Sequence, residues 1–206
     1  MARAVEKSSP ATDTFDGAYD AVVAALTAIG EDSAGLDRMA FAVTLVHTES
    51  AWVLETAYQL LRLGIPARSL HREATVGTHR RADLAIGATA IEFKSSYVSN
   101  ILHNRIEATQ RWLRPDIAKI RASDQPGIYV LTVPQLVGIE HQKHSFAHRA
   151  TATMTPEEIR TEGLDRYRKF LQDETAVTPT HVEIGHSVGP GEHGSVRLDA
   201  YVVPLL

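Results

Sequence analysis

Hydrophobic residues recur with two different periods along the chain, and the change of period separates helical segments from strands. Residues 15–29 and 36–63 carry apolar residues at the three- and four-residue spacing of helices. Gly30 follows the first of these segments, and Gly64 and Pro66 follow the second. Because glycine and proline commonly end helices, we predict one helix over each range.

The next part of the chain alternates between apolar and polar residues, which is typical of strands. We predict three strands, then a helix in which Pro115 causes a kink or starts a second segment, then a buried strand. A capping box at Thr155 opens a further helix, and two strands around a Gly-rich loop end the chain. These elements cover residues 67–76, 81–87, 89–96, 104–121, 127–133, 156 to about 173, and 181–206. Their order predicts an α/β fold, a mixed β-sheet flanked by helices.

The length and composition suit a single domain. We expect residues 1–14 to be a flexible lead-in and residues 15–206 to form one domain, because 206 residues can bury one sizeable core. Cysteine is absent, which excludes disulfides and thiolate metal sites and fits a cytoplasmic location. No apolar run approaches the roughly 18 residues that suggest a membrane span, and the first residues lack the apolar segment of a secretory signal.

The charge is distributed unevenly. The net charge is −4, yet residues 41–154 carry thirteen Lys and Arg against nine Asp and Glu. A basic face built from this middle part would be compatible with nucleic acid.

Three charged residues lie within the predicted strands 81–87 and 89–96: Asp83, Glu92 and Lys94. Successive side chains of a strand point to opposite faces. Glu92 and Lys94 should therefore share one face of the sheet, while Ile91 and Phe93 enter the core on the other.

A hairpin that turns near Gly87 would bring Asp83 beside Glu92 or Lys94. Two neighbouring carboxylates are suited to a hard divalent ion such as Mg²⁺, with Mn²⁺ as a substitute. Such an ion can polarise a phosphoryl oxygen and activate water, and a lysine can offset the charge that develops on the phosphate. The constellation predicts phosphodiester hydrolysis; the alternative is a surface ion pair between Glu92 and Lys94.

The spacing of Asp83, eight further residues and then Glu92-Phe93-Lys94 resembles the motif of the PD-(D/E)XK nuclease superfamily. The resemblance covers about residues 45–135 and includes the element order of the restriction-endonuclease-like fold. It implies that Asp83 and Glu92 are metal ligands and that Lys94 is the catalytic lysine. Ala82 stands where many members have proline.

The resemblance also implies a glutamate from the helix before the first strand, for which Glu49 and Glu55 are the candidates. Glu49 lies nearer the apolar stripe of that helix. His47 and Ser50 lie on the stripe itself, and we interpret them as polar residues of the core.

Basic residues near the motif are candidates for phosphate contacts. Residues 104–121 would flank the site in this fold, and two arginines precede Asp83; an ordinary basic helix face is the alternative interpretation. The predicted nucleic-acid-binding residues are Arg80, Arg81, Arg105, Gln110 and Arg111.

A second set of candidate ligands is the histidine-rich segment 141–148, with His141, His144 and His148. Histidines at this spacing on a helix can bind zinc, and an unrelated α/β enzyme could use them. The segment has weak helical periodicity, however, so a polar loop or a substrate-binding insertion is the preferred interpretation.

The sequence therefore predicts a Mg²⁺-dependent endonuclease that acts on DNA, in double-stranded form, in a restriction or defence role. A junction resolvase or repair nuclease is the nearest alternative. Because a duplex has two strands to cut, we expect a homodimer. The alternative class is a nucleic-acid-binding or protein-interaction module that keeps this fold without catalysis.

Overall fold

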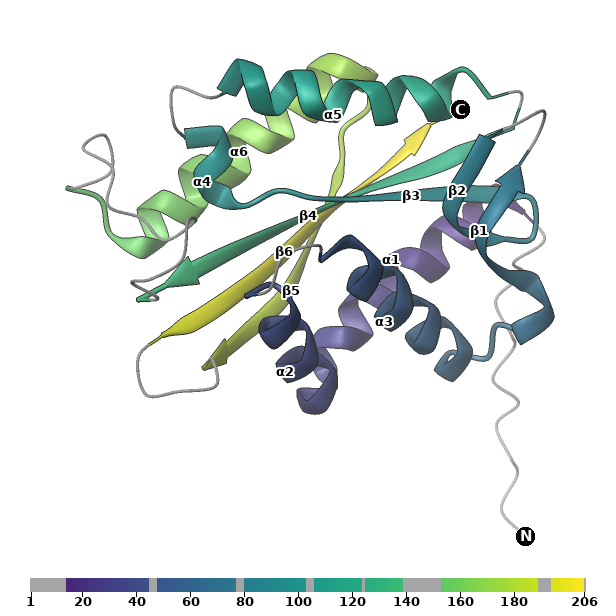
Figure 1. Ribbon diagram of the computed structural model, residues 1–206, viewed down its shortest axis with the longest axis horizontal. Helices are drawn as coiled ribbons and strands as arrows, with labels where there is room; N and C mark the ends of the chain where they lie inside the picture. The colour runs from purple at the N-terminus through teal and green to yellow at the C-terminus, as the bar shows by residue number, and fades with distance from the viewer. Residues whose placement is uncertain are drawn as a thin grey trace, which may run out of the picture.

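The computed structural model describes residues 14–44, 48–76, 80–102, 106–123, 125–138, 153–188 and 194–205. Six strands form one mixed sheet that has helices on both faces (Figure 1). The strands are β1 (Leu70–Val76), β2 (Arg80–Ile86), β3 (Thr89–Ser95), β4 (Gly127–Val137), β5 (Thr180–Val188) and β6 (Ser195–Leu205). The helices are α1 (Phe15–Glu31), α2 (Ser33–Ala42), α3 (Glu49–Arg62), α4 (Val98–Leu102), α5 (Ile106–Arg121) and α6 (Pro156–Thr175), with a short 3₁₀ turn at Ala67–Ser69.

The strand order is β1-β2-β3-β4-β6-β5. Only the central pair β3 and β4 is parallel within the described sheet, and the other neighbours run antiparallel. The predicted α/β class, a mixed sheet flanked by helices, is confirmed.

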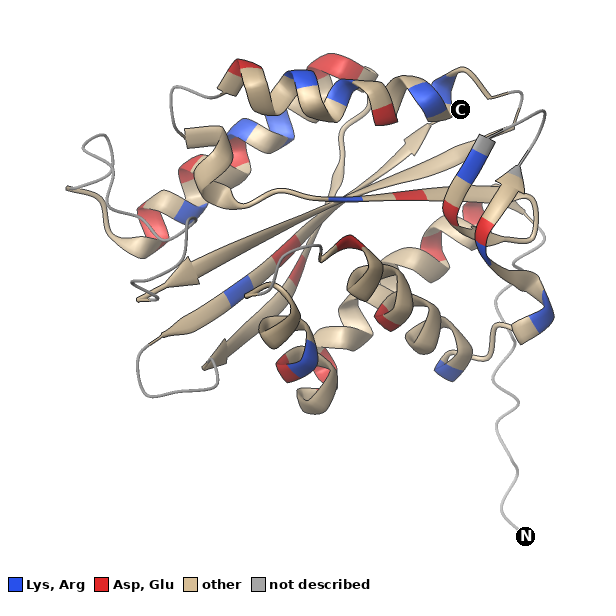
Figure 2. Ribbon diagram, in the orientation of Figure 1, with Lys and Arg blue, Asp and Glu red and all other residues tan. Residues whose placement is uncertain are grey.

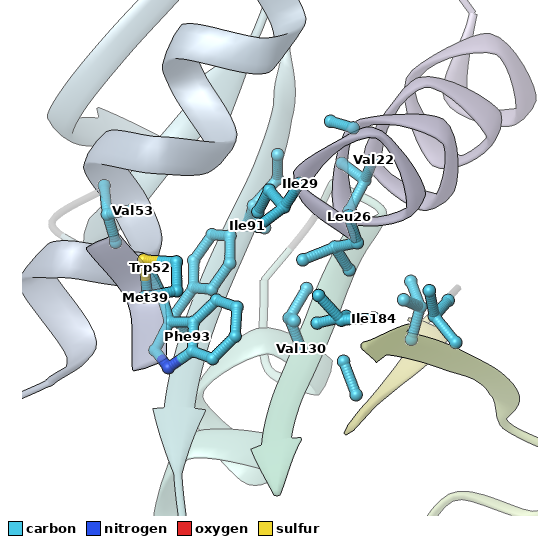
Figure 3. Close-up of a cluster of buried hydrophobic side chains, with 14 of the residues drawn as sticks. Val22, Leu26, Ile29, Met39, Trp52, Val53, Ile91, Phe93, Val130 and Ile184 are labelled. Carbon is cyan, nitrogen blue, oxygen red and sulfur yellow. The ribbon is translucent and has the colours of Figure 1, made fainter. Parts of the chain in front are cut away.

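Helices α1, α2 and α3 cover one face of the sheet (Figure 1). Ile91 and Phe93 of β3 are buried on this face, where they pack with Trp52, Met39 and Val130 (Figure 3). Burying an apolar side chain of this size contributes about 1.5–3 kcal/mol. The predicted alternation of β3 is therefore correct on its core side.

Helices α4, α5 and α6 cover the other face. Tyr129 and Leu131 of β4 pack there against Leu113 and Ile117 of α5. Glu92 and Lys94 project to this same face, since both bond to side chains of α5. A second hydrophobic layer thus surrounds the charged residues of β3.

The prediction of one helix over 36–63 is wrong. The helix α2 ends at Ala42, the hydroxyl of Thr44 donates to the carbonyl of Phe41 at 2.7 Å, and α3 begins at Glu49. β-Branched residues are weak helix formers, and a threonine hydroxyl that bonds the backbone competes with helix continuation. The interruption makes Glu49 the first residue of a new helix.

Other local predictions are confirmed. The β2–β3 hairpin turns at Gly87, whose φ of 57° suits glycine. The capping box of α6 is present, with the Thr155 hydroxyl accepting from the amide of Glu158. Pro115, by contrast, does not start a second segment: it lies inside α5, which remains one helix.

The predicted lead-in, 1–14, falls outside the described residues apart from Thr14. The hydroxyl of Thr14 caps α1 by accepting from the amide of Gly17 at 3.1 Å. Among the described helices, none has both the length and the apolar character that crossing a bilayer requires.

Candidate functional site

Asp83 lies where the β2–β3 hairpin opens. The paired register runs from Ile86 and Thr89 to Leu84 and Ile91. At the next position the amide of Phe93 donates to Asp83 Oδ2 at 2.8 Å. The Asp83 side chain thus accepts a hydrogen bond from β3 where the backbone pairing of the two strands ends. This bond fixes the Asp83 carboxylate beside the Glu92–Lys94 segment.

Glu92 is buried, with 7% of its surface exposed. Its Oε1 and Oε2 accept hydrogen bonds from Lys119 Nζ at 2.8 and 2.7 Å. Burial raises the pKa of Glu92, the Lys119 bond opposes this rise, and the negative charges of Asp83 and Asp116 add to it, so the pKa stays above its ordinary value. Glu92 is therefore a carboxylate short of positive charge.

Lys94 is held by two acids from different helices. Its Nζ lies 3.0 Å from Asp116 Oδ2 of α5 and 3.5 Å from Glu49 Oε1 of α3. It also lies 4.8 Å from the ring centroid of Trp112, within cation–π range. Burial alone would lower the pKa of Lys94, but Asp116 and Glu49 outweigh it and raise the pKa. Lys94 thus keeps its proton at neutral pH, where it is a fixed positive charge and a hydrogen-bond donor and is not suited to act as a base.

Tyr129 lies beneath these groups, opposite Glu92 in the β3–β4 register. Its side chain is fully buried, and its hydroxyl has no hydrogen-bond partner among the described residues. Burial, followed by the charges of Asp116, Glu49 and Glu92, raises the pKa of Tyr129 well above its ordinary value. The phenol therefore stays protonated and can donate one hydrogen bond into a negatively charged environment.

The charged side chains described above, with Asp116 and Lys119, form one group, which we call the acidic cluster. It contains four carboxylates and two ammonium groups, an excess of two negative charges. Its members are Glu49, Asp83, Glu92, Lys94, Asp116 and Lys119. Figure 2 shows both signs of charge on β3 and many charged positions along α5, whereas β4 carries none.

The donor types of the acidic cluster fit a hard divalent cation. Carboxylate oxygens are the ligands that Mg²⁺ prefers, and a divalent ion would balance the excess charge. In the described part of the chain, no three or more His, Asp or Glu side chains are already arranged around a metal-sized position. Both oxygens of Glu92 bond Lys119 instead, so ion binding requires that Lys119 give up at least part of this contact.

A pocket adjoins Glu92 between the hairpin and the end of α5. Two cationic side chains contribute to it beside small and apolar ones. Its lining residues are Arg81, Ala82, Ala90, Glu92, Lys119, Ile120 and Ser123. The free surface of this pocket is mostly apolar, so the charged ends of these side chains contribute little to it.

The structure separates the two predicted glutamates. Glu49 reaches the acidic cluster through Lys94, but Glu55 does not. The buried carboxylate of Glu55 accepts from Arg38 at 2.9 and 3.1 Å and from Gln59 at 3.1 Å. Because the Arg38 bonds tie α2 to α3, the structure gives Glu55 partners between these helices and does not bring it to the acidic cluster.

The predicted phosphate contacts are only partly described. Arg81 pairs with Glu73 and lines the pocket, while Arg111 is exposed and Gln110 half-buried on α5. Arg105 and the side chain of Arg80 lie outside the described residues, as do His47 and the whole histidine-rich segment 141–148.

Two hydroxyl groups near Lys94 have structural partners. The buried Ser96 bonds the hydroxyl of Tyr167 at 2.6 Å, and the Tyr97 hydroxyl donates to the carbonyl of Val43 at 2.5 Å. These bonds connect the chain just after β3 to α6 and to the end of α2.

The sequence interpretation missed the roles of Asp116, Lys119 and Tyr129. Asp116 lies three residues after the buried Leu113, so helical periodicity alone places it near the face of α5 that packs on the sheet. Tyr129 carries no comparable signal, because its place opposite Glu92 depends on the parallel pairing of β3 with β4.

Comparison of the chain with protein-family models, with curated proteins and with solved structures found no match.

Proposed function

We propose that this protein is a Mg²⁺-dependent nuclease of the PD-(D/E)XK type that hydrolyses DNA phosphodiester bonds, with Mn²⁺ as a substitute ion. The observation that carries the proposal is the convergence of Asp83, Glu92 and Lys94 at the opened hairpin, within a cluster that has excess negative charge. A surface ion pair between Glu92 and Lys94 is not what the side chains form, since each bonds a different partner from α5.

Asp83 and Glu92 would hold the ion. When bound, Mg²⁺ supplies polarisation of a phosphoryl oxygen and a lower pKa for water. Lys94 keeps its proton and is fixed between Asp116 and Glu49, so its ammonium can stabilise negative charge on the phosphate or orient a water molecule. The restriction-endonuclease-like form of the α/β fold belongs to this proposal.

The substrate we propose is double-stranded DNA. Arg81, which lines the pocket beside Glu92, and Arg111, on α5, are exposed cations. Such residues make sequence-independent phosphate contacts. We further propose a homodimer in a restriction or defence role, with a junction resolvase or repair nuclease as the nearest alternative.

One observation favours a second candidate, a nucleic-acid-binding or protein-interaction module without catalysis. Lys119 bonds both oxygens of Glu92, so an internal cation already occupies the contacts that a metal ion would need. A protein that had lost its metal could retain such a pair for stability alone.

A nuclease assay distinguishes the two candidates. Purified protein is incubated with duplex and single-stranded DNA, and with RNA, in Mg²⁺ or in EDTA. We expect cleavage of DNA in Mg²⁺ only, reduced by about 10²-fold or more in Asp83→Ala and in Lys94→Ala. Lys169→Ala, which removes an exposed lysine of α6 that pairs with Asp173, should retain full activity.

Cleavage in EDTA, or full activity in both site variants, would contradict the mechanism. Absence of cleavage on every substrate would support the binding module instead.

A further inference from the structure

Lys119 occupies the place beside Glu92 where a cation is needed. Its Nζ bonds both carboxylate oxygens, at 2.8 and 2.7 Å. The side chain of Glu92 is only 9% exposed, whereas that of Lys119 is 31% exposed. The carboxylate is thus fixed by its strand, and the ammonium reaches it from the solvent side on a flexible stem.

A divalent ion at Glu92 would compete with this ammonium. Both cations bind the same oxygens, and two positive charges a few ångströms apart repel strongly in a partly buried place. A lysine side chain has four rotatable bonds and can move without a change in the backbone. The ion and Lys119 therefore exclude one another, at least at full contact with Glu92.

The displaced ammonium would move toward solvent, since the Lys119 side chain is already partly exposed. Arg81 is exposed as well, and both residues line the pocket beside Glu92. The two cations would thus lie near one another at the surface, where such residues contact backbone phosphates.

We propose that Lys119 exchanges partners, bonding Glu92 in the metal-free protein and a phosphate of the nucleic acid, beside Arg81, once a divalent ion takes its place. This inference rests on the proposed function. It makes Lys119 a substrate-binding residue, and it couples ion binding to phosphate binding through one side chain.

The first measurement is Mn²⁺ binding by electron paramagnetic resonance, with the full chain and without DNA. Lys119→Met removes the charge and keeps the length of the side chain, and Lys119→Gln is a second variant in case the first fails to fold. In wild type, Mn²⁺ must displace the Lys119 ammonium from the Glu92 carboxylate, and losing such a contact changes an equilibrium by about tenfold or more. The neutral variants lack this competition, so they should bind Mn²⁺ at least about tenfold more tightly than wild type. Lys169→Met, which also removes one charge, should leave the affinity unchanged.

The second measurement is fluorescence anisotropy of a labelled duplex with a phosphorothioate backbone, at saturating Mn²⁺. Here the Lys119 variants should bind about three- to tenfold more weakly than wild type, since one phosphate contact is lost. Lys169→Met again serves as the control for net charge.

The outcomes separate the two proposals. Tighter Mn²⁺ binding together with weaker DNA binding supports the exchange. Equal or weaker Mn²⁺ binding by the Lys119 variants overturns it and makes Lys119 a structural partner of Glu92, while tighter Mn²⁺ binding with unchanged DNA affinity overturns its second step. If neither wild type nor any variant binds Mn²⁺, the proposed function itself fails.

Discussion

Two buried carboxylates on the same face of the sheet have pKa values that are shifted in opposite directions. Glu92 of β3 bonds Lys119 of α5, and Asp199 of β6 bonds Arg160 of α6. Burial opposes the charged form of both. The pKa of Glu92 is nevertheless raised, whereas that of Asp199 is lowered.

The difference lies in the partners. Asp199 receives two hydrogen bonds from the guanidinium of Arg160, at 2.9 and 2.7 Å, and lies 2.9 Å from Nε2 of His181. These bonds outweigh the burial that would raise the pKa of Asp199. Glu92 has a single ammonium and lies in the field of Asp83 and Asp116. We therefore call Asp199 compensated and Glu92 under-compensated, because a divalent ion that replaced the Lys119 ammonium would add positive charge at Glu92.

The largest expected effect is the loss of stability when Asp199 is replaced. Asp199→Ala leaves the largely buried Arg160 without its main partner, so we expect a loss of about 3 kcal/mol in the free energy of unfolding. Urea denaturation measures it. The matched control is Glu183→Gln, which removes an exposed partner of the same arginine and should cost less than about 0.5 kcal/mol. If Asp199→Ala and Glu183→Gln cost similar free energies of unfolding, Asp199 would not be the main partner of Arg160. The contrast drawn between Asp199 and Glu92 would then fail.

The two glutamates of α3 give the next largest contrast. Glu55→Gln weakens the bonds to Arg38 and should lower the free energy of unfolding by about 1–2 kcal/mol. Glu49→Gln should leave stability nearly unchanged and reduce DNA cleavage, because it removes one of the two acids that hold Lys94. Denaturation and cleavage rates measured on both variants test this, and the reverse assignment would show that the wrong glutamate has been placed at the site.

Metal addition should stabilise the protein through Asp83 and Glu92, and Asp199 should not contribute. Mn²⁺ at about ten times its dissociation constant should stabilise the wild type by about 1.4 kcal/mol. Thermal melts with and without the ion measure the shift. Asp83→Asn and Glu92→Gln should show little of it, while Asp199→Ala should keep it in full. An equal shift in Glu92→Gln would mean that the ion binds elsewhere.

The smallest expected effect concerns the pH dependence of stability without metal. A carboxyl group whose pKa is raised on folding contributes stability that is fully present below its unfolded pKa, ordinarily 4.5, and lost as pH rises through the folded pKa. In EDTA, the stability of Glu92→Gln relative to the wild type should therefore increase as pH rises above 4.5.

Asp199 has the opposite sign. Its lowered pKa contributes stability above the unfolded value, ordinarily 3.8, and that stability is lost as pH falls through the folded pKa. Unfolding curves of Glu92→Gln and Asp199→Asn against wild type, over acid and neutral pH, would show the two signs. A stability difference between Glu92→Gln and the wild type that does not increase with pH would contradict the view that Glu92 is under-compensated.

The sequence predicted the parts of the site that depend on local geometry. Strand alternation placed Glu92 and Lys94 on one face, and the hairpin turn at Gly87 brought Asp83 to them. Both follow from the two-residue period of a strand, which needs no knowledge of the rest of the fold.

The partners of these residues could not be predicted in the same way. Asp116 and Lys119 reach the strand only because α5 packs over β3, and Tyr129 reaches it only through the parallel pairing of β3 with β4. The choice between Glu49 and Glu55 required the end of α2 at Ala42, which the apolar periodicity across residues 36–63 concealed.

The central claim is that Asp83 and Glu92 together hold a divalent ion. A crystal soaked in Mn²⁺, with diffraction recorded at the manganese absorption edge, tests it most directly. We predict an anomalous difference peak within coordination distance of both carboxylates, with the ammonium of Lys119 moved away from Glu92. A peak absent from this position, with Lys119 still bonded to both oxygens of Glu92, would contradict the account.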